Sequence, residues 1–203
     1  MCVQSLIWTA VVTGASSGFA RSMTELVLAK GDIAVATLRK PEVISDLSFK
    51  YTSKQLLVLK LDVSKPAEVV AAFDAAVKAF GRIDVVFNNA GYNVLGEVEA
   101  TSEQIARGVF DVNFFGAVNV SKDAVRIFRD VNKPQGGRLS QMSSGVVYYK
   151  LVPLLSTQLL KAVSIRQLCL TRHKADRVGC LALNAISDAL AVEVDPEWNI
   201  KAC

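Results

Sequence analysis

A glycine-rich turn between an apolar run and a helical pattern is the feature that most constrains the fold of this chain. Residues 6–12 are nearly all apolar, which is typical of a strand buried on both faces of a parallel sheet. Residues 13–20 form the turn, and residues 19–30 carry apolar side chains at helical spacing, with Gly31 as a stop signal. The chain is therefore expected to open with a strand, a tight turn and a helix.

The same alternation continues along the chain. Apolar runs predict strands at 33–37, 56–59, 83–87 and 138–142, and helical patterns lie between them at 41–47, 66–80 and 101–129. Strands and helices that alternate at this spacing predict an α/β fold, a doubly wound parallel sheet in a Rossmann-like, three-layer α/β/α arrangement. We expect residues 1–203 to form a single domain of this type.

Two of the predicted helices begin near side chains that can cap them. Ser64 precedes Pro66 and is expected to cap the helix over 66–80, which Gly81 ends. Thr101-x-x-Gln104 resembles a capping box at the start of the long helix. These signals predict where the loops after the third and fourth strands end.

Composition narrows the class of protein. The chain has 203 residues, 51% of them hydrophobic and 21% charged, which suits one folded domain and excludes intrinsic disorder. A single His and four cysteines without C-x-x-C spacing argue against a zinc module or a disulfide scaffold: Cys2, Cys169, Cys180 and Cys203.

Charge and hydropathy exclude two kinds of partner. The net charge of +4 comes from scattered residues, so no nucleic-acid partner is expected. The first twenty residues carry no charge, but their compact apolar part is too short to span a bilayer, and they lack the basic start of a secretory signal. We expect no membrane partner and a cytoplasmic location.

The glycine-rich turn suggests a ligand. Gly14 and Gly18 allow the backbone to turn sharply and to approach a pyrophosphate, which would bind the free N–H groups at the start of the following helix. A glycine pair can also serve a tight turn alone. Its position after the first strand of an alternating α/β series favours dinucleotide binding.

Four motifs in order resemble those of the short-chain dehydrogenase/reductase family, from about residue 5 to Ser144. The T-G-x-x-x-G-x-G motif of that family stands here at residues 13–20, with Ala20 in place of the last glycine. Asp62 follows the third strand, N-N-A-G occupies 88–91, and Asn113 lies in the long helix. Each motif alone could be structural, as a helix start or a turn. Their joint order favours the resemblance.

The resemblance implies a nucleotide cofactor and the residues that hold it. Asp62 would receive the adenine amino group. The cofactor-binding residues implied are Gly14, Ser16, Ser17, Gly18, Phe19, Arg39, Asp62, Val63, Asn89, Ala90 and Gly91.

The end of the second strand favours NADP over NAD. A carboxylate there would bind the ribose 2′-hydroxyl and repel a 2′-phosphate, but the sequence has Arg39 and Lys40 instead. Asp32 lies at the other end of the strand. Arg39 can pair with a phosphate, although both basic residues could also be ordinary surface charges.

The resemblance also implies catalytic residues, and here the pattern is broken. Ser144, rather than Ser143, would hold the substrate oxygen, and Asn113 would support a water relay. The family's Tyr-x-x-x-Lys pair, which exchanges a proton with the substrate, is absent from the sequence. Tyr148 and Tyr149 are not followed by Lys four residues on, and Thr157 before Lys161 is too weak an acid, so we interpret that spacing as coincidence.

Residues 145–185 do not resemble the family, and the resemblance resumes at Ile186. We hypothesise that this stretch derives from a retained intron, a frame error or a divergent splice form. Residues 187–194 resemble the end of the family's catalytic helix, and 195–201 resemble the turn into its sixth strand. We expect the sheet to be incomplete at its C-terminal edge, because the chain given ends at Cys203 before that strand.

These features predict an NADP-preferring oxidoreductase that interconverts an alcohol and a ketone or aldehyde by hydride transfer. Its partners would be a small-molecule substrate and a second copy of the chain. The alternative is a dinucleotide-binding or interaction protein whose catalysis is impaired. A third hypothesis is that the chain is an unstable fragment without function.

Overall fold

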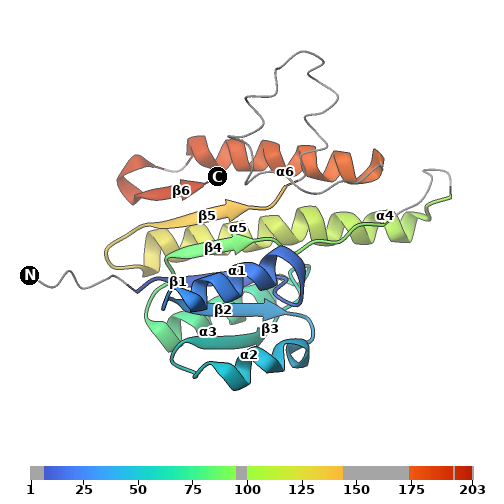
Figure 1. Ribbon diagram of the computed structural model, residues 1–203. Coiled ribbons are helices and arrows are strands. Elements are labelled where there is room, and N and C mark those ends of the chain that lie inside the picture. Colours follow the sequence, from blue (N-terminus) through green and yellow to red (C-terminus); the bar gives the residue numbers. More distant parts are fainter. Residues whose placement is uncertain (1–6, 95–99, 144–173, 194, 203) are drawn as a thin grey trace, which may run out of the picture.

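The computed structural model describes residues 7–94, 100–143, 174–193 and 195–202, and Figure 1 shows their arrangement. A parallel sheet has the strand order β3-β2-β1-β4-β5-β6. The order reverses between β1 and β4, which lie side by side at the centre. The strands are β1 (Thr9–Thr13), β2 (Ile33–Leu38), β3 (Leu56–Lys60), β4 (Val85–Asn88), β5 (Gly137–Gln141) and β6 (Ile200–Ala202).

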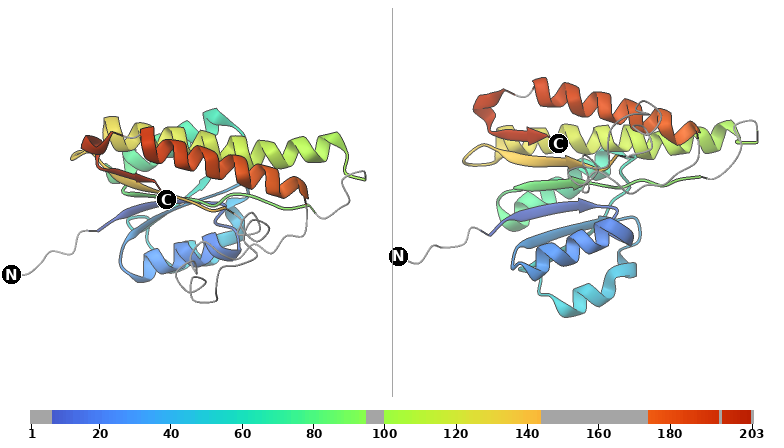
Figure 2. Two further views of the ribbon diagram at one scale, coloured as in Figure 1. Left: turned by 90° about the horizontal axis from the view of Figure 1, so that it is seen from above. Right: turned by 45° about the horizontal axis from the view of Figure 1, so that its top comes forward.

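Helices cover both faces of the sheet, as predicted for a Rossmann-like fold. Figure 2 shows α1 on one face and α4, α5 and α6 on the other. The helices are α1 (Gly18–Ala29), α2 (Ser45–Lys50), α3 (Pro66–Phe80), α4 (Glu103–Phe110), α5 (Ala117–Arg126) and α6 (Lys174–Glu193), with short 3-10 turns η1 (Pro41–Ile44) and η6 (Pro196–Trp198).

Alternate residues of each central strand belong to different halves of the core. Val11 of β1 packs on the face covered by α3 and α5, whereas Val12 packs on the face covered by α1. Val86 and Phe87 of β4 divide in the same way. Because successive side chains of a strand point to opposite faces, a sheet covered on both sides needs continuous apolar runs. This is why the runs in the sequence identified the strands.

The long helix expected over 101–129 is a continuous helical segment with two wider turns. α4 leads into the π-helical turn η2 (Asp111–Gly116), and α5 leads into a second, η3 (Ile127–Val131). Single π-turns within α-helices occur frequently at functional sites. One of these two, η2, carries Asn113.

Both predicted capping residues are wrong. Ser102, not Thr101, precedes α4, and its side chain accepts a hydrogen bond from the Ile105 N–H. Lys65 precedes α3, which no side chain in the described part of the chain caps, and Ser64 donates to the side chain of Asp62. α3 begins one residue later than a cap at Ser64 requires, so Lys65 and not Ser64 occupies the N-cap position.

The C-terminal part differs from the sequence-based expectation in two respects. Residues 174–193 form one helix, α6, so helical structure begins before Ile186 and includes most of the predicted 187–194 helix. The sixth strand, which was expected to be missing, is present as the three residues of β6, and they pair in parallel with β5. β6 is one of the two edge strands of the described sheet, and β3 is the other. In the described part, no helix is both long and apolar enough to cross a membrane.

Gly137 provides a test of the core on the α5 side. An alanine Cβ at this position would overlap the ring of Phe128, which is fully buried beneath β5. Overpacking of a close-packed core costs about 1–3 kcal/mol, so Gly137→Ala should lower the free energy of unfolding by about that amount, measured by urea denaturation.

The matched control is Gly108→Ala in α4, where the nearest atom is the hydroxyl at the end of the partly exposed Tyr92 side chain. Alanine is the better helix former by about 1 kcal/mol, so this variant should be as stable as the wild type or more so. The cost of Gly137→Ala should also shrink in a Phe128→Leu background. An undiminished cost there, or none in the wild type, would contradict this packing.

Candidate functional site

A cavity of about 360 Å³ lies where the strand order reverses, at the carboxyl ends of the strands. Open α/β sheets bind ligands in this position. Every cofactor-binding residue predicted from the sequence lines the cavity, and Asn113 does as well. Further lining residues that sequence reasoning did not single out as binding residues include Leu38, Leu61, Tyr92, Val112, Ala117, Met142 and Leu183.

The two glycines of the first turn meet different surroundings. Gly14 has φ of +72°, and a Cβ there would lie 3.0 Å from Ala90 Cα, so the turn packs directly on the segment after β4. Gly18 has φ of +56°, and no atom of the described residues lies within 4 Å of the place of a Cβ. Only glycine adopts such backbone readily, and its missing side chain leaves the start of α1 open to the cavity. Ala20, in place of the motif's last glycine, is fully buried against the sheet.

Thr13 joins the ends of β1 and β4. Its buried hydroxyl oxygen accepts the N–H groups of Asn89 and Ala90, both at 2.9 Å. The same hydroxyl donates a longer bond of 3.4 Å to Asn88 Oδ1. One side chain thus fixes the turn that carries residues 88–91 against the glycine-rich turn.

A chain of side-chain hydrogen bonds continues from Asn88 across β5 to α5. Asn88 Nδ2 donates to Gln141 Oε1 at 2.6 Å and to the Ala117 carbonyl at 2.9 Å. Gln141 Nε2 donates to Ser121 Oγ at 2.6 Å, and Ser121 donates on to Ala117 at 2.7 Å. Sequence reasoning missed Gln141 and Ser121. The signal available for Gln141 was its side-chain amide at the end of β5, beside the buried strand β4.

Asn113 clamps the segment after β4 from the other side. Its Oδ1 accepts the Tyr92 N–H at 3.0 Å, and its Nδ2 donates to the Tyr92 carbonyl at 2.8 Å. A Cβ on Gly91 would lie 3.1 Å from Asn113 Oδ1, so the glycine permits this approach. The side chain of Asn113 therefore positions the backbone at residues 91–92.

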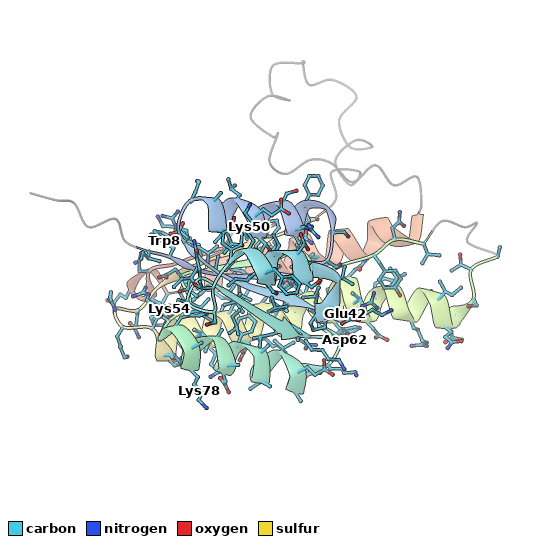
Figure 3. All side chains as sticks on the ribbon, turned by 60° about the horizontal axis from the view of Figure 1, so that its bottom comes forward. Trp8, Glu42, Lys50, Lys54, Asp62 and Lys78 are labelled. Atoms are coloured by element: carbon cyan, nitrogen blue, oxygen red, sulfur yellow. The ribbon has the colours of Figure 1, made fainter. Side chains whose placement is uncertain are left out.

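The segment after β3 forms the far wall of the cavity. Asp62 lies just beyond the carboxyl end of β3 (Figure 3) and accepts hydrogen bonds from Ser64. Val63 packs against the helical segment opposite, where a Cβ on Gly116 would lie 2.6 Å from Val63 Cγ2. Asn119 Nδ2 donates to the Val63 carbonyl at 3.1 Å. Residues 62–63 are thus held from two elements.

The charge of the Asp62 carboxyl follows from its neighbours. Partial burial raises its pKa, but the hydrogen bonds from Ser64 and the positive charges of Lys65 and Arg39 together lower the pKa below its ordinary value. Arg39 itself is exposed beyond the end of β2 and forms no hydrogen bond or ion pair with any described residue. It leaves a free guanidinium at the cavity.

The catalytic side is described only in part. Ser144 lies outside the described residues, as do Tyr148, Tyr149, Thr157 and Lys161. Ser143 is described: it lines the cavity, and its buried Oγ has no hydrogen-bond partner among the described residues. Leu183 of α6 reaches the cavity and is only 5% exposed.

Comparisons with known proteins agree with this geometry. The model of a family described as short chain dehydrogenase matches residues 8–153. An uncharacterized oxidoreductase of Schizosaccharomyces pombe is 32% identical over 198 residues, which cover 98% of this chain and 59% of that protein. Oxidoreductase CalM of Penicillium decumbens is 32% identical over 197 residues, covering 95% and 58%.

A crystal structure of a short-chain dehydrogenase from Streptomyces avermitilis superimposes with a TM-score of 0.77 at 28% sequence identity, over 97% of this chain and 63% of that one. The chain thus spans about three fifths of the length of the relatives it matches. The ordered motifs, the cavity at the strand reversal and these matches together show that the chain belongs to the short-chain dehydrogenase family.

Proposed function

We propose that this cavity binds a nicotinamide adenine dinucleotide, with NADP preferred to NAD. We further propose that the protein is an oxidoreductase that interconverts an alcohol and a ketone or aldehyde by hydride transfer. The observation that carries the proposal is that all the residues implied by the family motifs line one cavity at the strand reversal. The proposal includes a cytoplasmic location, pairing of two copies, and no nucleic-acid or membrane partner.

The glycine-rich turn fits a pyrophosphate. Among the described residues no side chain caps the N-terminus of α1, which leaves its first N–H groups available to an anion. Gly18 leaves open space beside them, and Ser16, Ser17 and Phe19 line the same wall. A side chain at Gly18 would close this approach.

Arg39 supports the preference for NADP. Its free guanidinium lies where β2 ends, the position at which a carboxylate would select the 2′-hydroxyl of NAD. A phosphate can accept two parallel hydrogen bonds from one guanidinium. The nearest acidic group in the cavity wall, Asp62, is already held by Ser64.

A nicotinamide cofactor held by these residues would supply hydride-transfer chemistry. Of the residues implied in catalysis, Asn113 holds the backbone at Tyr92, and Ser144 would orient the substrate oxygen. No Tyr-x-x-x-Lys pair occurs in the sequence to move the accompanying proton. That absence supports a second candidate function, a dinucleotide-binding protein with impaired turnover.

Cofactor preference is tested by thermal unfolding with saturating NADPH or NADH. A ligand that binds only the folded state raises Tm, and NADPH should raise it more than NADH does. Arg39→Ala should weaken NADPH binding roughly 10- to 100-fold, because hydrogen bonds to a charged group contribute about 1.5–3 kcal/mol, and should leave NADH affinity almost unchanged.

The matched control is Lys54→Ala, which removes the same charge at the opposite end of β3, where Lys54 is exposed (Figure 3). It should change neither affinity more than twofold. Equal losses for both nucleotides in Arg39→Ala, or a stronger response of the wild type to NADH, would contradict the NADP preference.

Turnover separates the two candidate functions. General acid–base catalysis contributes about 10²–10⁴-fold, so NADPH-dependent reduction of carbonyl compounds should be slower by about that factor than in a family member that carries the Tyr-x-x-x-Lys pair. Both enzymes should bind NADPH in the same assay. A kcat equal to that of the complete relative would show that another group in this chain supplies the proton, and would reject the impaired-turnover candidate.

A further inference from the structure

Ser143 places a buried hydroxyl in the wall of the cavity. Its Oγ has no hydrogen-bond partner among the described residues, whereas the side chains of Asp62 and Asn113 in the same wall both have partners. A hydroxyl that is buried without a partner destabilises a folded protein, so such groups are rare and need an explanation. A ligand in the cavity would supply the partner that the described part of the protein does not.

The end of β5 is fixed by the side chain of Gln141. Its Oε1 accepts Asn88 Nδ2 at 2.6 Å, and its Nε2 donates to Ser121 Oγ at 2.6 Å. The next residue, Met142, continues the pairing of the strands, because its N–H donates to the Asn88 carbonyl at 2.9 Å. β5 is therefore tied to β4 and to α5 up to the residue before Ser143. The direction in which the Ser143 hydroxyl points follows from this anchored strand end.

The strand order identifies the half of a dinucleotide that Ser143 would meet. Arg39 and Asp62 follow β2 and β3 on one side of the strand reversal, whereas Ser143 follows β5 on the other side. A dinucleotide binds across this reversal, with its pyrophosphate at the first glycine-rich turn. If Arg39 binds the 2′-phosphate of the adenosine half, the nicotinamide half extends toward the ends of β4 and β5. That half carries ribose hydroxyls and a carboxamide, and a serine hydroxyl can donate to or accept from each of them.

We propose that the hydroxyl of Ser143 binds the nicotinamide half of the dinucleotide, and that Gln141 is the positioning residue that aims it. The inference rests on the proposed dinucleotide function, and it is separate from the role of Ser144, which would orient the substrate oxygen. Because Gln141 fixes the strand end before the ligand arrives, less conformational freedom is lost on binding. The free protein bears the cost of the unpaired hydroxyl, and the bound nucleotide removes that cost.

The test compares the Kd of NADPH with that of adenosine 2′,5′-bisphosphate, which contains the adenosine half alone. The wild type should bind NADPH more tightly. Ser143→Ala should weaken NADPH binding roughly three- to tenfold through the loss of one hydrogen bond, and should leave the affinity for the bisphosphate unchanged within twofold. Gln141→Met keeps the size of the side chain without its hydrogen bonds, and should have the same selective effect.

The matched control is Gln55→Met at the amino end of β3. It removes a bond of the same kind, from Gln55 Nε2 to the Leu28 carbonyl at 3.2 Å. Because Gln55 lies at the end of the sheet opposite to the cavity, this variant should change neither affinity more than twofold.

Two further measurements separate ligand binding from a structural role. Ser143→Ala removes a hydroxyl that has no partner in the described part of the chain, so its Tm without nucleotide should equal or exceed that of the wild type. In the double variant, NADPH affinity should fall no further than in Ser143→Ala alone, because Gln141 acts through Ser143. If Gln141→Met does not fold, Ser121→Ala takes its place, since it removes one of the two partners of Gln141 and should also weaken NADPH binding selectively.

Equal affinity of the wild type for the two ligands would overturn the inference and leave the dinucleotide function standing. So would an equal loss of both affinities in Ser143→Ala, or a lower Tm of this variant without nucleotide, because the hydroxyl would then already have a partner within the protein. Losses that multiply in the double variant would overturn the role of Gln141. Failure of the wild type to bind either ligand would overturn both the inference and the proposed function.

Discussion

The hydroxyl of Thr13 is the interaction on which the rest of the site depends. It accepts two N–H groups from the turn at residues 88–91, at the junction of the two central strands. Buried N–H groups need partners, and this turn has left the sheet ladder, so without the hydroxyl those two groups would lose a buried acceptor. The bond also brings Ala90 against Gly14, which explains why a side chain at Gly14 would not fit. The two walls of the cavity are therefore one packed unit.

The two-sided core explains why the cavity lies where it does. Helices cover both faces of the sheet, so the central strands bury apolar side chains on each face. Neither face of these strands is therefore available for a polar site. The carboxyl ends of the strands are where polar groups gather, and the chain supplies them in sequence order from Thr13 through Asp62 and Asn88 to Gln141. Asn113 on η2 and Asn88 then tie the helical layer to this edge.

Much of the fold, and the set of residues that line the cavity, could be predicted because their signals are local. Continuous apolar runs predicted the strands, and Gly14 and Gly18, which both have positive φ, lie in the glycine-rich turn after the first strand. The two capping errors arose because α3 and α4 each begin one residue later than the capping patterns require. Ser64 bonds Asp62 rather than a helix N–H, and Ser102 rather than Thr101 precedes α4. Gln141 was missed because its partners, Asn88 and Ser121, are distant in sequence and meet only in the folded chain.

Ser144 and the remainder of the unusual segment up to residue 173 lie outside the described structure, so the prediction for the substrate side stays a prediction.

Hydrogen exchange with and without saturating NADPH tests the central claim most directly, because it reports binding at each backbone segment. Bound nucleotide should slow exchange at the carboxyl ends of the strands, in residues 14–20, 61–64 and 88–92. The amino ends of the same strands, at residues 31–33, 53–55 and 82–84, should exchange as before. Protection at the amino ends, or binding of NADPH without protection of residues 14–20, would contradict a dinucleotide site built on Thr13 and the glycine-rich turn.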